Sequence, residues 1–328
     1  MNGRLRDDPF HEILILKSGS VVEKASPRIQ NDTPKEGQFS EQNDDRDGNG
    51  DYLDNMLGAS WSVRSRNSTP SDGPESTVTA HDVYQLVDSS TPTGGFAHSN
   101  TIEVAWQFNV YKVETFPSYC WDVLLQTISA TIPYVHGACS LYFSRTSNGN
   151  DHSFSDTDCE TGMNDKLDGS SCFDEWLRMD KHLSSTTTSQ VSRRASCMQG
   201  SGWIRAATHC FPATRDSLKK LRQLAAKTDG GHAATCFGAI CGMLGVSPNQ
   251  ATSMFLYCTV RDMVNAGVRM NLIGPLEGCA LIRTLCRAVE NVLQNRAVVH
   301  WTDAHQVAPI VEVLANAHER LYTRLFNS

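Results

Sequence analysis

Residues 89–99 read Ser-Ser-Thr-Pro-Thr-Gly-Gly-Phe-Ala-His-Ser and lie between two segments with helical patterns. Pro92 fixes one backbone angle and lacks an N–H, and Gly94 and Gly95 can adopt conformations closed to other residues. We therefore predict a tight turn between helices. A loop that binds an anion through its backbone amides is the alternative, but no Gly-Lys-[Ser/Thr] follows, so the stretch is not a P-loop.

Helical patterns extend on both sides of this turn. The segment 80–87 precedes it, and a helix over 101–110 follows, with Asn100 as its cap and Glu103 placed to complete a capping box. The further patterns with helical spacing cover 118–143 with a kink at Pro133, then 173–183, 192–210, 218–226, 233–244, 248–266, 275–294 and an amphipathic helix over 310–325.

The polar and apolar residues do not alternate over any length that would build a sheet. We therefore predict an all-α fold, a single bundle domain of about ten helices over 79–328. Residues 1–78 have the acidic and polar composition of a disordered N-terminal tail. A second polar stretch at about 145–171 is typical of one long inserted loop.

Charge and composition argue against several classes of protein. A net charge of −7 over 328 residues argues against binding nucleic acid by bulk charge. No apolar run is long enough to span a bilayer, and the first residues lack a signal-peptide core, so we expect a cytoplasmic protein without a membrane partner. The eleven cysteines lie singly, without a Cys-x-x-Cys pair, which predicts reduced, mostly buried thiols.

The side chains suggest no convincing enzyme. The sequence has no Gly-x-Ser-x-Gly, no His-Glu-x-x-His and no nucleotide-binding loop. Arg193 and Arg194, in Ser-Arg-Arg-Ala-Ser, fit a solvated face or an ion pair better than a phosphate site or a kinase target. The spacing of His318 and Glu319 favours a surface ion pair over a metal site. The residues therefore predict a helical protein that acts by binding, with no catalytic residues.

Four segments, in order, resemble the UreF family of urease accessory proteins. They are the turn at 92–99 with Glu103, the run 192–200, the stretch from His232 to Gly278, and the last twelve residues, Ala-His-Glu-Arg-Leu-Tyr-Thr-Arg-Leu-Phe-Asn-Ser, over 317–328. The resemblance covers about residues 80–328 apart from the inserted loop. It departs at Thr101-Ile102, where the family commonly has Gly-Leu, and after Arg269, where a Pro-Leu-Gly order is more usual.

Membership of this family would imply an all-α protein that dimerises and has no turnover of its own. Such proteins assemble with UreD (also called UreH) and the GTPase UreG, regulate GTP hydrolysis by UreG, and promote nickel insertion into apo-urease. Nickel would pass through the complex in transit, with no tightly bound cofactor, and the resemblance leaves its ligands unassigned.

The resemblance also carries over a set of family-motif or partner-interface residues. They are Pro92, Gly94, Gly95, Phe96, His98, Ser99, Glu103, Arg193, Arg194, Gln199, Gly200, Arg269, His318, Glu319, Tyr322, Arg324, Leu325 and Phe326. Two other functions remain open: a small-molecule hydrolase that uses Glu103 with His98, and a protein that stores nickel.

Overall fold

The computed structural model describes residues 79–146, 172–228, 230–295 and 297–328. The expected tail over 1–78 and nearly all of the expected loop at 145–171 lie outside these residues. Within them the chain forms eleven α-helices and no strand, so the all-α prediction is confirmed. The helices are α3 (Ala80–Val87), α4 (Ile102–Gln107), α5 (Phe116–Ala130), α6 (Ile132–Thr146), α7 (Cys172–Thr186), α8 (Gln190–Cys210), α9 (Arg215–Ala225), α10 (Ala233–Met243), α11 (Pro248–Arg269), α12 (Pro275–Asn295) and α13 (Pro309–Ala317).

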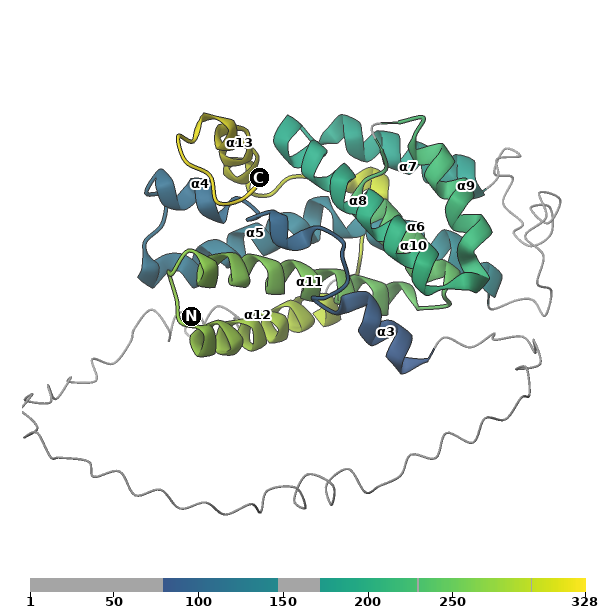
Figure 1. Cartoon of the computed structure of the whole chain (residues 1–328), viewed down its shortest axis with the longest axis horizontal. Helices are drawn as coiled ribbons and strands as arrows, with labels where there is room; N and C mark the ends of the chain where they lie inside the picture. The colour runs from purple at the N-terminus through teal and green to yellow at the C-terminus, as the bar shows by residue number, and fades with distance from the viewer. Residues whose placement is uncertain (1–78, 147–171, 229, 296) are drawn as a thin grey trace, which may run out of the picture. The chain divides into compact units, whose positions relative to one another are not determined.

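Helix α10 forms the centre of the core. Its sequence, Ala-Ala-Thr-Cys-Phe-Gly-Ala-Ile-Cys-Gly-Met, carries no charge, and every residue is buried. Gly238 and Gly242 face α6, and a Cβ on either would collide with a carbonyl oxygen of that helix. The small residues therefore let α6 and α10 pack closely, and α8 and α11 also pack against α10 (Figure 1).

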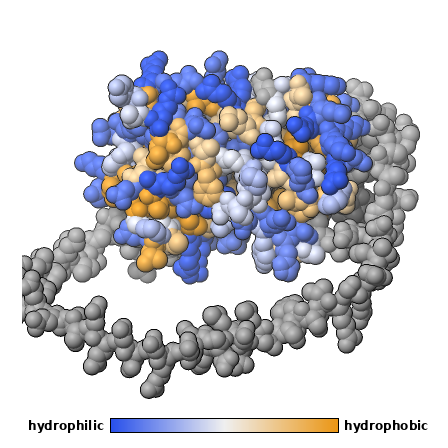
Figure 2. Space-filling view, in the orientation of Figure 1, coloured by the Kyte–Doolittle hydropathy of each residue, from blue (hydrophilic) through white to orange (hydrophobic). Residues whose placement is uncertain are grey.

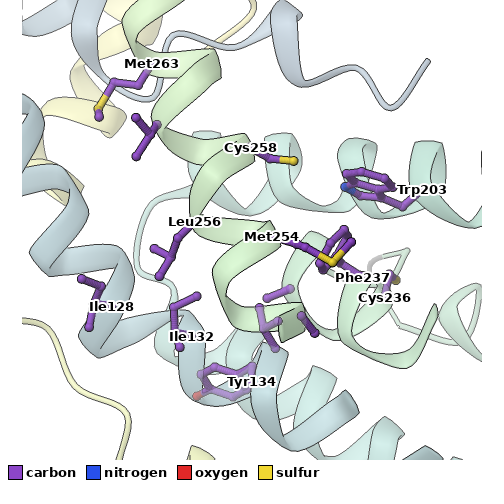
Figure 3. Close-up of a cluster of buried hydrophobic side chains, with 14 of the residues drawn as sticks. Ile128, Ile132, Tyr134, Trp203, Cys236, Phe237, Met254, Leu256, Cys258 and Met263 are labelled. Carbon is purple, nitrogen blue, oxygen red and sulfur yellow. The ribbon is translucent and has the colours of Figure 1, made fainter. Parts of the chain in front are cut away.

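The core around α10 is filled by side chains from several helices. Figure 3 shows Trp203 of α8 beside Phe237 of α10, with their ring centroids 4.8 Å apart, and Met254 of α11 close by. Ile128 and Ile132 approach the same cluster from α5 and α6. Because these apolar side chains come from segments far apart in the sequence, their burial ties the bundle together.

Two expected helices differ from the structure by more than shifted ends. The pattern over 118–143 belongs to two helices, which meet at Thr131, and Pro133 occupies the first turn of α6, where a missing N–H costs nothing. The expected amphipathic helix over 310–325 ends at Ala317 and is followed by one 3₁₀ turn, η6 (His318–Arg320). Residues 321–328 are irregular, and we call them the strap.

The cysteine prediction agrees with the structure. Six of the ten cysteines in the described ranges are buried, and none of those ten forms a disulfide. Burial raises the pKa of the Cys139 and Cys258 thiols to about 12, so these thiols are unreactive. No helix in the described part of the chain combines the length and the apolar character needed to cross a bilayer.

Candidate functional site

The turn around Gly94 and Gly95 lies between α8 and α11. Gly94 has a φ of +85°, which favours glycine, and Gly95 begins the 3₁₀ turn η1 (Gly95–Ala97). A Cβ on Gly95 would collide with the carboxylate of Asp262 on α11, and one on Gly202 of α8 would collide with the carbonyl of Thr93. The predicted tight turn is therefore confirmed, and its glycines allow close packing on both sides. Pro92, in the same turn, is exposed.

Glu103 binds the strap rather than its own helix end. Its side chain is 3% exposed, and its carboxylate accepts hydrogen bonds from the main-chain N–H of Leu325 at 2.6 Å and of Phe326 at 3.1 Å. The Nε2 of Gln107 donates to it at 3.4 Å. The expected capping box is therefore wrong: α4 follows Thr101, whose φ is +71° and whose side chain caps nothing. Thr101 stands near the place where the resembled family commonly has glycine, the residue that favours such a φ.

The strap also pairs with residues 97–99. The N–H of Asn327 donates to the carbonyl of Ala97 at 2.8 Å. The N–H and the hydroxyl of Ser99 both donate to the main-chain oxygen of Ser328, at 2.6 and 2.9 Å. The Nδ1 of His98 lies 2.6 Å from the Ser328 hydroxyl. Together with Glu103, these contacts hold the strap by its backbone along the Gly-Gly turn and α4.

His318 is buried, although a surface ion pair with Glu319 was expected. Its side chain is 1% exposed, and its Nε2 lies 3.3 Å from Oε2 of Glu103. Its Nδ1 has no hydrogen-bond partner among the described residues. Burial, and to a lesser degree the charge of nearby His318, lower the pKa of His98 below its ordinary value. The two histidines therefore belong to one buried polar cluster.

Arg269, at the end of α11, links the turn to the strap. Its guanidinium donates to the carbonyl of Phe96 at 2.6 Å and lies 4.5 Å from the ring centroid of Phe326. The Phe326 side chain is buried, whereas Leu325 is 53% exposed and Tyr322 is fully exposed. The strap thus binds the domain through its backbone and Phe326, and presents Tyr322 and Leu325 to solvent.

Arg194 and Glu319 form an ion pair on the surface; an ion pair was one of the two roles expected for Arg194, but no partner was predicted. The guanidinium of Arg194 on α8 lies 2.6 Å from the Glu319 carboxylate, and both side chains are at least half exposed. This hydrogen bond lowers the pKa of Glu319. Arg324 donates to the main-chain oxygen of Glu319 at 2.9 Å, and Arg193 donates to the carbonyl of Thr187. These arginines lie at the edge of the site rather than in it.

A cavity of about 180 Å³ opens beside the buried histidines. His98, His318, Gln199 and Ser328 line it together with the start of α10. Gly200, the neighbour of Gln199, does not line it; a Cβ there would collide with the carbonyl of Gly231, so α8 packs closely on the loop before α10.

Sequence reasoning missed Asp180 and Arg261, and it gave no role to Ser196 within the 192–200 run; all three hold this region together. Asp180 of α7 is buried and accepts from the N–H of His232 at 2.8 Å, which fixes the start of α10. Ser196 of α8 accepts from the N–H of Ala233 at 3.1 Å. Arg261 of α11 pairs with Asp262 and lies over the Phe96 ring. No local pattern marks these residues, because each contacts a segment distant in sequence.

The arrangement favours binding over catalysis. Main-chain and side-chain donors already occupy the carboxylate of Glu103, so it lacks a free position from which to exchange a proton with a substrate. Among the described residues, no group of three or more His, Cys, Asp or Glu side chains is placed to hold a metal ion. Three of the four motif segments instead meet at one structural unit: the 92–103 segment, Arg269 and the last residues form the strap and the turn to which it binds.

Comparison with known proteins adds independent evidence. The family model for UreF matches residues 110–286. A urease accessory protein F of Oryza sativa subsp. indica is 32% identical over 246 residues, which cover 74% of this chain and 83% of that protein. Its counterpart from Arabidopsis thaliana is 32% identical over 248 residues, 75% of this chain and 91% of the relative. Urease accessory protein UreF of Paenarthrobacter aurescens (strain TC1) is 28% identical over 75% of this chain and 96% of its own length.

Proposed function

The chain belongs to the UreF family of urease accessory proteins, and on that premise we propose that it is a non-enzymatic scaffold for loading nickel into apo-urease. In this proposal it binds UreD (UreH) and the GTPase UreG in the cytoplasm, acts as a homodimer, and regulates GTP hydrolysis by UreG. Nickel is the cargo of the complex, and the nucleotide site belongs to UreG.

The strap is the single observation that carries this proposal. Its backbone is fixed by Glu103 and by residues 97–99, while Tyr322 and Leu325 point to solvent. A segment held in this way loses little conformational entropy when a partner binds it. Tyrosine, the residue at 322, is among the side chains that carry most of the binding energy at protein interfaces.

Helix α13 extends the same surface. Its inner side, with Val311 and Leu314, packs on the domain, but Ile310 and Val313 are more than half exposed. Figure 2 shows apolar side chains among polar ones on this face, in both halves of the domain. We therefore assign α13 and the strap to the surface that binds UreD and, through it, UreG.

The test is capture of the complex with an affinity tag on UreG. The intact chain, co-expressed with UreD and UreG, should be recovered in a ternary complex on size-exclusion chromatography. Val313→Asp and Leu325→Asp should each remove it from the complex, because a charge would be buried in an apolar interface.

Leu276→Asp is the matched control. Leu276 is 86% exposed on α12, which packs against α11 and α5 rather than α13, and its replacement should leave the complex intact. If Val313→Asp and Leu325→Asp are folded and still recovered with UreG, the assigned surface is wrong. If the intact folded chain binds neither UreD nor UreG, the scaffold proposal itself fails.

A further inference from the structure

The cavity beside the strap presents hydrogen-bond donors that lack acceptors. Ala234, the second residue of α10, lines the cavity and is 1% exposed, and its N–H has no acceptor among the described residues. The preceding cap residue, His232, does not cap the helix with its side chain. The first N–H groups of a helix need acceptors from outside it, so a buried one without an acceptor indicates that something else binds there.

His318 is a second, independent observation at the same cavity. Only 1% of its side chain is exposed to solvent, and the residue lines the cavity. Glu103 binds its Nε2 and does not line the cavity, so Nδ1 is the ring nitrogen that a molecule in the cavity can reach. That Nδ1 has no partner in the described structure. With the Nε2 proton facing the Glu103 carboxylate, Nδ1 is left as an acceptor without a donor, and the O–H of a phosphate can donate to it.

The remaining lining suits a negative group rather than a positive one. Gln199 supplies an amide and Ser192 a hydroxyl, while no Asp, Glu or Cys side chain lines the cavity. The Ser196 hydroxyl already bonds the N–H of Ala233 and the ring of His232. The main-chain oxygen of Ser328 is already bound by both donors of Ser99. The start of α10 also contributes the positive end of a helix dipole, which attracts anions. The Asp180 carboxylate binds the N–H of His232 there and leaves that of Ala234 without an acceptor.

We propose that this cavity binds a small inorganic oxyanion of the phosphate or sulfate type. The oxyanion would accept from the N–H of Ala234 and from the Gln199 amide, and the O–H of a phosphate would donate to Nδ1 of His318. The cavity volume of about 180 Å³ leaves room for such an ion, because one water takes up about 30 Å³ of the liquid. The bound ion would join α10, α8 and η6, and so connect the core of the domain to the strap.

The decisive experiment is calorimetric titration of the full chain with sodium phosphate and, separately, sodium sulfate at constant ionic strength. The wild-type chain should bind one ion saturably. Gln199→Glu, which keeps the shape but adds a carboxylate, should weaken binding at least tenfold. Gln190→Glu is the control, because Gln190 is exposed on the same helix and does not line the cavity.

NMR with histidine-selective labelling gives a readout that needs no variant. Phosphate should shift the ring signals of His318 and leave those of His300, which is exposed and lies outside the cavity, unchanged. The proposal is overturned if neither anion binds saturably up to about 10 mM, ten times the Kd of a weak 1 mM site. It is also overturned if Gln199→Glu binds phosphate as well as the wild type, or if nickel rather than phosphate shifts His318.

Discussion

Helix α10 and the strap are held in the domain by opposite means. All eleven residues of α10 are buried, none is charged, and its place depends on close packing against α6, α8 and α11. The strap has no regular structure, and its backbone is held by Glu103, Ala97 and Ser99. Apolar packing therefore fixes the core, and hydrogen bonds to a few buried polar groups fix the segment that we assign to partner binding.

The difference separates stability from function. Packing is spread over many side chains, so the position of α10 is robust except where two backbones touch. The strap depends on few contacts, and one carboxylate makes several of them. A substitution at Glu103 should therefore loosen the strap and leave the core folded, whereas a substitution in α10 should affect the whole domain.

The largest effect is expected from Gly238→Val. A side chain at Gly238 would collide with the carbonyl of Val135 and crowd Ala138, so α6 and α10 would have to separate. We expect the free energy of unfolding to fall by about 3 kcal/mol, measured by urea denaturation. Gly274→Ala is the control, since a Cβ there meets only the Glu277 side chain at ordinary distance. Equal stability of the two variants would contradict the close packing.

The second effect is expected from Glu103→Gln. The amide keeps the size of the side chain but removes the charge that accepts from the N–H groups of Leu325 and Phe326. We therefore expect the free energy of unfolding to fall by about 2 kcal/mol. Hydrogen exchange should speed up at the amides of Leu325 and Phe326 and stay slow in α10. Glu114→Gln, at an exposed position in η2 (Val113–Thr115), should change neither quantity. Faster exchange in α10 as well would show that the strap and the core do not open independently.

A smaller effect concerns pH. Burial lowers the folded-state pKa of His98 below its ordinary value of 6.5, so the unfolded chain takes up a proton first as the pH falls. The contribution of neutral His98 to stability is present above pH 6.5 and is lost as the pH falls from there toward the lowered pKa. Urea denaturation at pH 7 and pH 5.5 should show a smaller loss for His98→Gln than for the wild type. His136, whose pKa burial also lowers, leaves a residual pH dependence in both proteins; an unchanged dependence would exclude His98 as its source.

The smallest effect is expected from Arg194→Ala. The Arg194–Glu319 pair is exposed on both sides, and such pairs are screened by solvent and salt. We expect an unchanged urea midpoint and unchanged amide exchange in the strap. A clear loss of protection at Leu325 would mean that the surface pair, and not only Glu103, holds the strap.

Much of the fold could be predicted because its signals are local. The small and apolar run of α10 and the Ser-Pro start of α11 mark those helices from neighbouring residues alone. The break at Thr131 was missed because Ile128 and Ile132 continue one apolar stripe across it. The expected helix over 310–325 included Leu321 and Leu325, because both fit the helical spacing. The helix ends earlier, and the Glu103 carboxylate binds the amide of Leu325, 222 residues away in sequence.

The site could be predicted only as a set of residues, and not as an arrangement. The resemblance selected Glu103, His98, Arg269 and the 318–326 stretch, and the structure brings these together. The contacts among these residues could not be derived from the sequence. Glu103 lies three residues after Asn100, so a capping box gave it a local role and hid its contact with the strap. Ser196 and Asp180 carry no local signal, because their roles depend on where α10 begins.

The pairing of Ser99 with Ser328 also has a consequence for the order of events during protein synthesis. The two residues are 229 positions apart, so this contact cannot form until residue 328 has left the ribosome. Closing so long a loop is slow compared with forming helices and hairpins of helices. The bundle around α10 can therefore form first, and the carboxylate of Glu103 stays exposed to water until the strap closes over it.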